Sequence, residues 1–110
     1  MKLNWKDYTT YNPGNVTGYY AKNTGYIYFI RCNEYIKVGK SSNLYQRVHQ
    51  LQGSNPHELK LVGLYKSLDL KADEKFFHDE VRKIANNIRG EWFKSNSELV
   101  KYVDLITKHK

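Results

Sequence analysis

Residues 25–47 read GYIYFIRCNEYIKVGKSSNLYQR, and this stretch decides the fold. Its first part, from Tyr26 to Arg31, is β-branched and aromatic, which is the composition of a β-strand. The next three residues, 32–34, have the right length for a hairpin loop. Residues 35–38 then return as the antiparallel partner, so the stretch predicts a β-hairpin.

The hairpin leads into a predicted helix that opens at Asn43 and ends at Gly53. Asn43 and Gln46 form a variant of the capping box, in which a side chain at the start of the helix accepts a backbone hydrogen bond. The apolar stripe of this helix consists of Leu44, Val48 and Leu51.

The rest of the chain predicts one more strand and two more helices. The strand covers about residues 59–66, and the second helix covers about residues 69–85, with a core stripe of Phe77, Val81 and Ile84. A capping box of Ser95 and Glu98 begins the last helix, which points Leu99, Val103 and Ile106 inward. The order β-β-α-β-α-α predicts an α+β domain with a small three-stranded antiparallel sheet flanked by helices.

The chain divides into a short arm and one domain. Residues 1–24 are polar and Tyr-rich and carry turn signals, so we interpret them as an irregular arm. Residues 25–110, including the C-terminal helix, form the predicted domain. A chain of 110 residues has the usual size of a single domain.

Charge and cysteine content narrow the function classes. The chain has 18 Lys and Arg against 11 Asp and Glu, a formal net charge of +7, which favours a polyanionic partner such as DNA. No apolar run approaches the ~20 residues of a membrane span, so no membrane partner is expected. Cys32 is the only cysteine, which excludes an intrachain disulfide and fits a reducing intracellular compartment, cytoplasmic or nuclear.

A family resemblance rests on residues 38–44, VGKSSNL, followed by Arg47. This segment is similar to the YVGKAKNL…R stretch of the excision-repair incision subunit. A Lys before Val-Gly, a later Glu and His one helical turn apart, and the sequence GEWF at 90–93 resemble a phage- and virus-rich branch of the GIY-YIG nuclease superfamily. The resemblance runs from about residue 25 to residue 93, and it implies a small metal-dependent nuclease with the corresponding fold.

Tyr28 and Arg47 are the first two candidate catalytic residues. A tyrosine phenolate can take a proton from an attacking water, but at a reference pKa near ~10 only about 0.1% is ionised at neutral pH. Nearby cations lower that pKa, and Lys37, Lys40 and Arg47 are the candidates. The resemblance implies that Tyr28 is the general base and Arg47 the catalytic arginine. The alternative is a structural Tyr on a half-buried strand and a surface Arg on an amphipathic helix.

Lys37, Gly39 and Lys40 form a second group of candidates. Lys37 stands where the family usually has its second Tyr, and it can polarise a phosphate but cannot act as a phenol. Tyr35, two residues earlier on the same strand face, is a possible substitute for that phenol. Gly39 permits close backbone approach, and Lys40 beside it is a candidate phosphate contact.

Glu74 is the candidate metal ligand, and its carboxylate suits one Mg²⁺ or Mn²⁺ ion. His78 lies four residues later, hence on the same helical face, where it can orient a water or contact phosphate. Asp73 is the rival carboxylate, but its helical phase directs it away from the face of Glu74. For the Asn that the family often carries, the candidates are Asn86 and Asn87. We interpret residues 92–93, Trp-Phe, as closing the core.

The leading hypothesis is therefore a metal-dependent endonuclease that hydrolyses DNA phosphodiester bonds. The alternative on the same fold is a catalytically impaired nucleic-acid-binding module, motivated by Lys37 in place of the second Tyr and by the charge of +7. A third possibility is a domain whose basic face binds an acidic protein partner.

Overall fold

The computed structural model describes residues 24–108, so nearly all of the predicted N-terminal arm lies outside the described residues. Five strands and three helices follow one another as β1, β2, α1, β3, α2, β4, β5 and α3. The five strands form one antiparallel sheet in the order β3-β1-β2-β5-β4. The predicted α+β class is confirmed.

The predicted hairpin is the centre of this sheet. Strand β1 spans Gly25–Cys32 and pairs with β2, Tyr35–Ser41, through a two-residue turn in which Asn33 has φ of 55°. Asparagine tolerates this left-handed conformation better than most residues. Strand β3, Lys60–Ser67, pairs with the other edge of β1. These three strands match the prediction to within a few residues.

The sheet has five strands, so the prediction of three was wrong. A second hairpin joins β4, Asn87–Arg89, to β5, Trp92–Lys94, and β5 extends the sheet by pairing with β2. Each strand has only three residues, too few for a clear alternation of apolar and polar side chains. The turn is made at Gly90, whose φ of 52° favours glycine.

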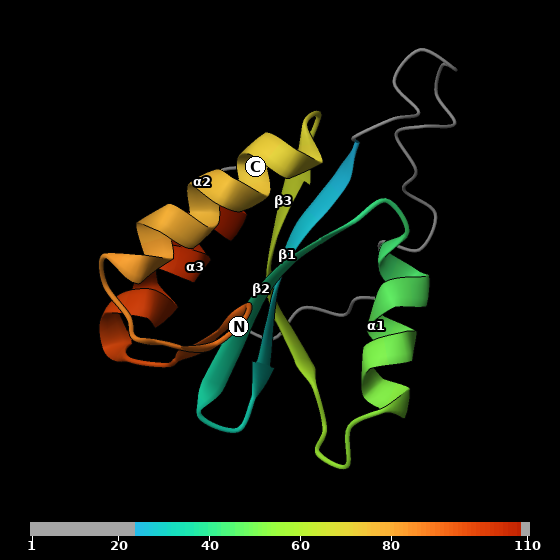
Figure 1. The fold of residues 1–110 in the computed structure, drawn as a ribbon, viewed down its shortest axis with the longest axis horizontal. Helices are drawn as coiled ribbons and strands as arrows, with labels where there is room; N and C mark the ends of the chain where they lie inside the picture. The colour runs from blue at the N-terminus through green and yellow to red at the C-terminus, as the bar shows by residue number, and fades with distance from the viewer. Residues whose placement is uncertain (1–23, 109–110) are drawn as a thin grey trace.

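The helices cover both faces of the sheet (Figure 1). Helix α1, Leu44–Gly53, packs its Leu44 and Val48 against Tyr28 and other residues of β1 and β3. Helices α2, Leu70–Arg82, and α3, Ser97–Lys108, cover the opposite face, where their apolar stripes meet Ile27 and Phe29 of β1. The two faces of β1 therefore belong to two separate hydrophobic clusters.

Side-chain caps fix where the helices begin. The predicted cap of α1 is confirmed, because Asn43 Oδ1 accepts a hydrogen bond from the Gln46 backbone at 3.1 Å. Asp69 caps α2 in the same way. The predicted cap of α3 was wrong by one residue: Asn96, not Ser95, accepts the hydrogen bond from Leu99 N at 2.7 Å. Within residues 24–108, no helix has the length and apolar character needed to cross a bilayer.

Candidate active site

Tyr28 and Gly39 face each other across β1 and β2, and their contact begins the site. The two residues are register partners, and the Tyr28 side chain is fully buried. A Cβ atom at position 39 would lie 2.4 Å from both Cζ and Oη of Tyr28. The predicted close approach at Gly39 is therefore real, and its partner is the tyrosine ring.

We expect Gly39→Ala to displace the Tyr28 ring and to lower the free energy of unfolding by about 1–3 kcal/mol, as overpacking of a filled core does. Chemical denaturation measures this loss. Gly53→Ala is the matched control, because apart from its chain neighbours and the backbone of its own helix no described atom lies within 4 Å of a Cβ there. Equal stability of the two variants would contradict the contact.

Arg47 reaches the same phenol from helix α1. Its Nε donates a hydrogen bond to Tyr28 Oη at 3.4 Å, and this contact raises the pKa of the guanidinium, which stays charged. Burial raises the pKa of Tyr28 above 10.0, and the hydrogen bond and charge of Arg47 oppose that rise without overcoming it. The charges of Glu91 and Glu74 raise the pKa of Tyr28 further. Of the three candidate cations, Arg47 is the one that contacts the phenol, and the expected lowering of the Tyr28 pKa was wrong because burial outweighs the charge of Arg47.

Glu74 on α2 pairs with Lys40 on β2. Lys40 Nζ donates to Glu74 Oε1 at 2.8 Å, and this hydrogen bond raises the pKa of Lys40. The second oxygen, Glu74 Oε2, is buried and has no hydrogen-bond partner among the described residues. A buried carboxylate oxygen without a partner is costly and is therefore a candidate ligand atom for a cation.

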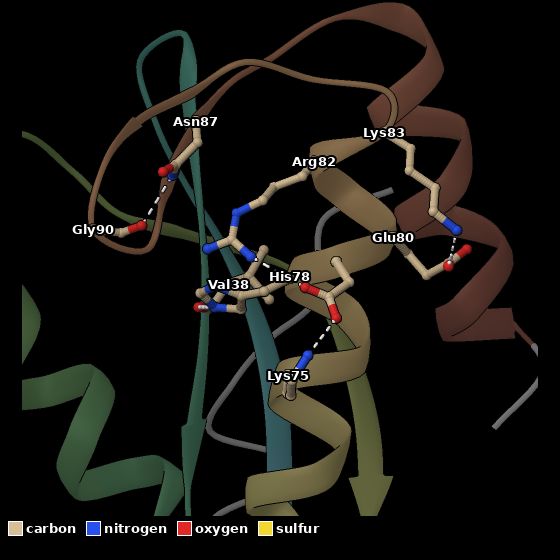
Figure 2. Close-up of polar contacts among 9 residues, drawn as sticks. Val38, Lys75, His78, Glu80, Arg82, Lys83, Asn87 and Gly90 are labelled. Atoms are coloured by element: carbon tan, nitrogen blue, oxygen red, sulfur yellow. Dashed lines mark hydrogen bonds and ion pairs between the residues drawn. The ribbon is translucent and has the colours of Figure 1, made fainter.

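His78, one turn after Glu74, is held by the backbone of β2. Its Nε2 lies 2.8 Å from the carbonyl oxygen of Val38, and Figure 2 shows the ring directed from α2 toward that residue. A carbonyl oxygen only accepts, so Nε2 donates this hydrogen bond, and Nδ1 is the ring nitrogen left to bind a cation. Histidine ligands of metals are oriented by hydrogen bonds of this kind from the second ring nitrogen.

Glu91 enters the site from the β4–β5 turn. Its backbone oxygen accepts a hydrogen bond from Val38 N at 3.0 Å, and its side chain pairs with Lys37 Nζ at 2.9 Å. Burial alone would raise the pKa of Glu91, but the hydrogen bond and the charge of Lys37 outweigh it, so the pKa lies below 4.5. Lys37 thus sits in the site, with a carboxylate as its partner.

Glu74, His78 and Glu91 together form a possible cation site. One ligand atom of each lies within 4.8 Å of the others. Two carboxylates and an imidazole are suitable donors for Mn²⁺, and the carboxylates suit Mg²⁺ as well. Glu74 Oε2, which has no partner in the described part of the chain, and the oriented His78 ring both fit such an ion. Glu74 was predicted as the metal ligand by itself, and the structure places two further donors beside it.

The chain matches a protein-family model over most of its length. The model described as the T5orf172 domain matches residues 25–107. The chain belongs to the T5orf172 domain family. This family is phage-associated and is related to GIY-YIG/HNH-like nuclease modules. No curated protein and no solved structure matches the chain significantly.

The strand alternation explains how this T5orf172 domain brings residues from both sheet faces to one place. Lys37 and Gly39 lie on the face that α1 covers, whereas Lys40 points to the face of α2. Lys37 is the last β2 residue that pairs with β5. Beyond Lys37, side chains from the two faces of the sheet can meet around Gly39, because glycine has no side chain that would separate them.

Glu91 is the residue that sequence reasoning missed. A hairpin signal in the sequence could have revealed it. Gly90-Glu91 stands between segments that contain apolar residues, a pattern compatible with a two-residue hairpin turn. Asn87, a candidate for the family's Asn, instead donates to the backbone oxygen of Gly90 (Figure 2). It also donates to the backbone oxygen of Trp92, and both contacts stabilise this turn. Phe93 closes the core as predicted, but Trp92 stays partly exposed on the other face.

The rival carboxylate, Asp73, lies elsewhere in the T5orf172 domain. It accepts a hydrogen bond from Ser67 Oγ at 2.6 Å at the end of β3. The prediction that it points away from Glu74 agrees with this contact.

The ion pair of Lys37 and Glu91 makes a testable contribution to acid stability. A carboxyl group whose pKa is lowered in the folded state stabilises the fold above its ordinary value of 4.5, and this stabilisation is lost as the pH falls below it. We expect Lys37→Gln to flatten the dependence of unfolding free energy on pH below 4.5. The difference should stay within about 1 kcal/mol, because Glu91 is partly exposed to solvent. Urea denaturation between acid and neutral pH measures it, and parallel curves for both proteins would be the contrary result.

Proposed function

We propose that the protein is a metal-dependent endonuclease of the GIY-YIG type that hydrolyses phosphodiester bonds of DNA. One observation supports this most strongly: Glu74, His78 and Glu91 each contact residues 37–40 of β2, the segment in which Gly39 packs against Tyr28. The phenol of Tyr28 in turn contacts Arg47. A cation site beside a tyrosine and an arginine is suited to phosphoryl chemistry. Membership of a nuclease-related family agrees with it.

Each side chain has a role in this proposal. Arg47, Lys37 and Lys40 bind the phosphate oxygens and stabilise the charge that builds up at phosphorus. Tyr28 Oη, in its ionised form, takes a proton from the attacking water, whose oxygen then bonds to phosphorus. The bond to the leaving oxygen breaks, and that oxygen takes a proton from solvent.

The Glu74–His78–Glu91 group would hold one Mg²⁺ or Mn²⁺ ion, which supplies Lewis-acid stabilisation of phosphate charge when bound. Glu91 offers a donor that the resemblance alone did not assign. Lys37 pairs with Glu91 and Lys40 pairs with Glu74, so the two lysines neutralise these carboxylates. In this proposal both lysines also contact the phosphate.

A second candidate function is a nucleic-acid-binding module without catalysis. The burial of Tyr28 favours it, because a raised pKa keeps the phenol protonated at neutral pH. This module would bind DNA in a salt-sensitive manner, as a nuclease also would. Of the two candidates, only the nuclease would also cleave the bound DNA.

Incubation with supercoiled plasmid separates the two candidates. We expect conversion to the open circular or linear form with Mn²⁺ or Mg²⁺ and none with EDTA. A branched and a flapped oligonucleotide are incubated in parallel, so that a requirement for DNA structure is tested as well. Retention of every substrate on a gel without scission would favour the binding module.

Arg47→Ala is expected to lower the cleavage rate constant by about 10²–10³-fold, the usual cost of removing one group that stabilises transition-state charge. Single-turnover kinetics at saturating protein measures it. Arg82→Ala is the matched control, since Arg82 pairs with Asp79 on the exposed surface of α2. A similar rate for both variants would remove Arg47 from the mechanism.

A further inference from the structure

We propose that a groove beside the active site binds unpaired nucleotides, so that the substrate is DNA with a single-stranded segment next to the scissile bond. The inference rests on the proposed function and specifies its substrate class. The groove, here called the aromatic groove, has a volume of about 530 Å³ and is lined by residues that include Asn33, Tyr35, His57, Ile88, Arg89 and Trp92. Such a volume lies in the ~300–1,000 Å³ range of small-molecule sites, so flat rings can enter it.

The aromatic groove is continuous with the active site through Lys37. Trp92 is the register partner of Lys37, and Lys37 Nζ lies 5.6 Å from the centre of the Trp92 ring. The same Nζ is 2.9 Å from Glu91 Oε1. Since alternate residues share a strand face, Tyr35 and Lys37 lie on the face of Gly39 and Tyr28. A strand that places a phosphate at Tyr28 and Arg47 can therefore continue over Trp92.

The chemistry of the groove matches bases with exposed faces. Single-stranded nucleic acids bind to aromatic side chains on which bases stack, beside cations that contact the backbone. Tyr35 and Trp92 supply the rings, and Arg89 is an exposed cation on the same wall. Lys94 Nζ lies 5.4 Å from the centre of the Tyr35 ring and also pairs with Glu34. A base stacked on either ring thus has a positive charge nearby for its phosphate.

A duplex fits this arrangement less well, because the faces of paired bases are covered by their neighbours in the stack. An acidic protein segment would find the cations but would make little use of the rings. The net charge of +7 and the adjacent phosphate-handling side chains favour nucleic acid.

The test is the affinity of the full-length protein for two labelled oligonucleotides in EDTA, measured by fluorescence anisotropy. One is a short oligothymidylate, and the other is a hairpin duplex with the same number of phosphates. We expect tighter binding of the single strand and a loss of at least about fivefold in that affinity for Trp92→Leu, as the removal of one stacking platform predicts. Trp92→Phe should recover most of the affinity, since a ring is restored.

Two further variants distinguish a specific loss of binding from misfolding of the protein. Arg89→Gln replaces an exposed residue, so it should fold normally, weaken single-strand binding and reduce its salt dependence. Phe76→Leu is the matched control, because Phe76 is 54% exposed on α2, across the sheet from the groove, and its loss should leave the affinity unchanged. Equal affinity for strand and duplex, or equal losses in Trp92→Leu and Phe76→Leu, would overturn the inference.

Failure of the inference is distinguishable from failure of the proposed function, because binding in EDTA requires neither the ion nor cleavage. If the protein nicks DNA with the metal but Trp92→Leu leaves single-strand binding unchanged, only the inference about the aromatic groove is overturned. Single-strand selectivity that depends on Trp92, in a protein that cleaves no substrate, supports the groove and contradicts the nuclease.

Discussion

Glu74→Gln is expected to lower the rate constant of Mn²⁺-dependent cleavage by at least about a thousandfold. The change removes the charge of the carboxylate whose buried Oε2 has no hydrogen-bond partner within residues 24–108. Stabilisation of transition-state charge by a metal ion amounts to several kcal/mol, and each ~1.4 kcal/mol is tenfold in rate. Single-turnover cleavage at saturating protein measures the effect.

A binding measurement identifies the cause of that loss. We expect isothermal titration calorimetry without DNA to detect Mn²⁺ binding to the wild-type protein and weaker or no binding to Glu74→Gln. Asp79→Asn is the matched control, since Asp79 also lies on α2 but pairs with Lys75 on the surface. If Asp79→Asn and Glu74→Gln bound the ion equally, Glu74 would not be its ligand.

Tyr28→Phe is expected to lower cleavage by about 10²–10⁴-fold, the range for loss of a general base. Phenylalanine fills the same space beside Gly39, so the fold should lose only about 1 kcal/mol, the net value of a hydrogen bond. Tyr102→Phe is the control, because burial also raises the pKa of Tyr102, which lies on α3. Rapid cleavage by Tyr28→Phe would assign the proton transfer to another group.

The pH dependence of the wild-type rate tests the same residue. Burial raises the pKa of Tyr28 above 10.0, so the ionised fraction grows about tenfold per pH unit throughout the neutral range. The logarithm of the cleavage rate should rise with pH in this range, and Tyr28→Phe should lose the part of the slope that the phenol provides. The protonated form is favoured by folding, so stability should decline only as the pH rises past 10.0.

The part of the site carried by local sequence patterns was predictable. The strand composition of residues 26–31 and the Asn43 cap set the hairpin and α1, and these elements bring Tyr28, Gly39 and Arg47 together. Alternation within strands and the 3.6-residue helical period are short-range rules, and they hold for β1, β2 and the helices, whereas irregular pairing interrupts the alternation in β3 and β4. Glu74 and His78 share a helical face for the same reason.

The contribution of Glu91 depends on long-range pairing that local patterns do not encode. Its turn is held by the hydrogen bond from Val38 N, more than 50 residues earlier in the chain. Short strands such as β4 and β5 gain their stability from the sheet that they join rather than from their own composition. The orientation of His78 likewise depends on the backbone oxygen of Val38, which no side-chain pattern reveals.

The most direct test of the proposed site is the cleavage of bound DNA by the wild-type protein and by Glu74→Gln, with Mn²⁺ and with EDTA. Protein concentrations are chosen so that both proteins saturate the DNA. We predict scission only by the wild type and only with the ion, at equal DNA occupancy. Equal scission by both proteins, or scission that persists in EDTA, would contradict a metal-dependent site built on Glu74.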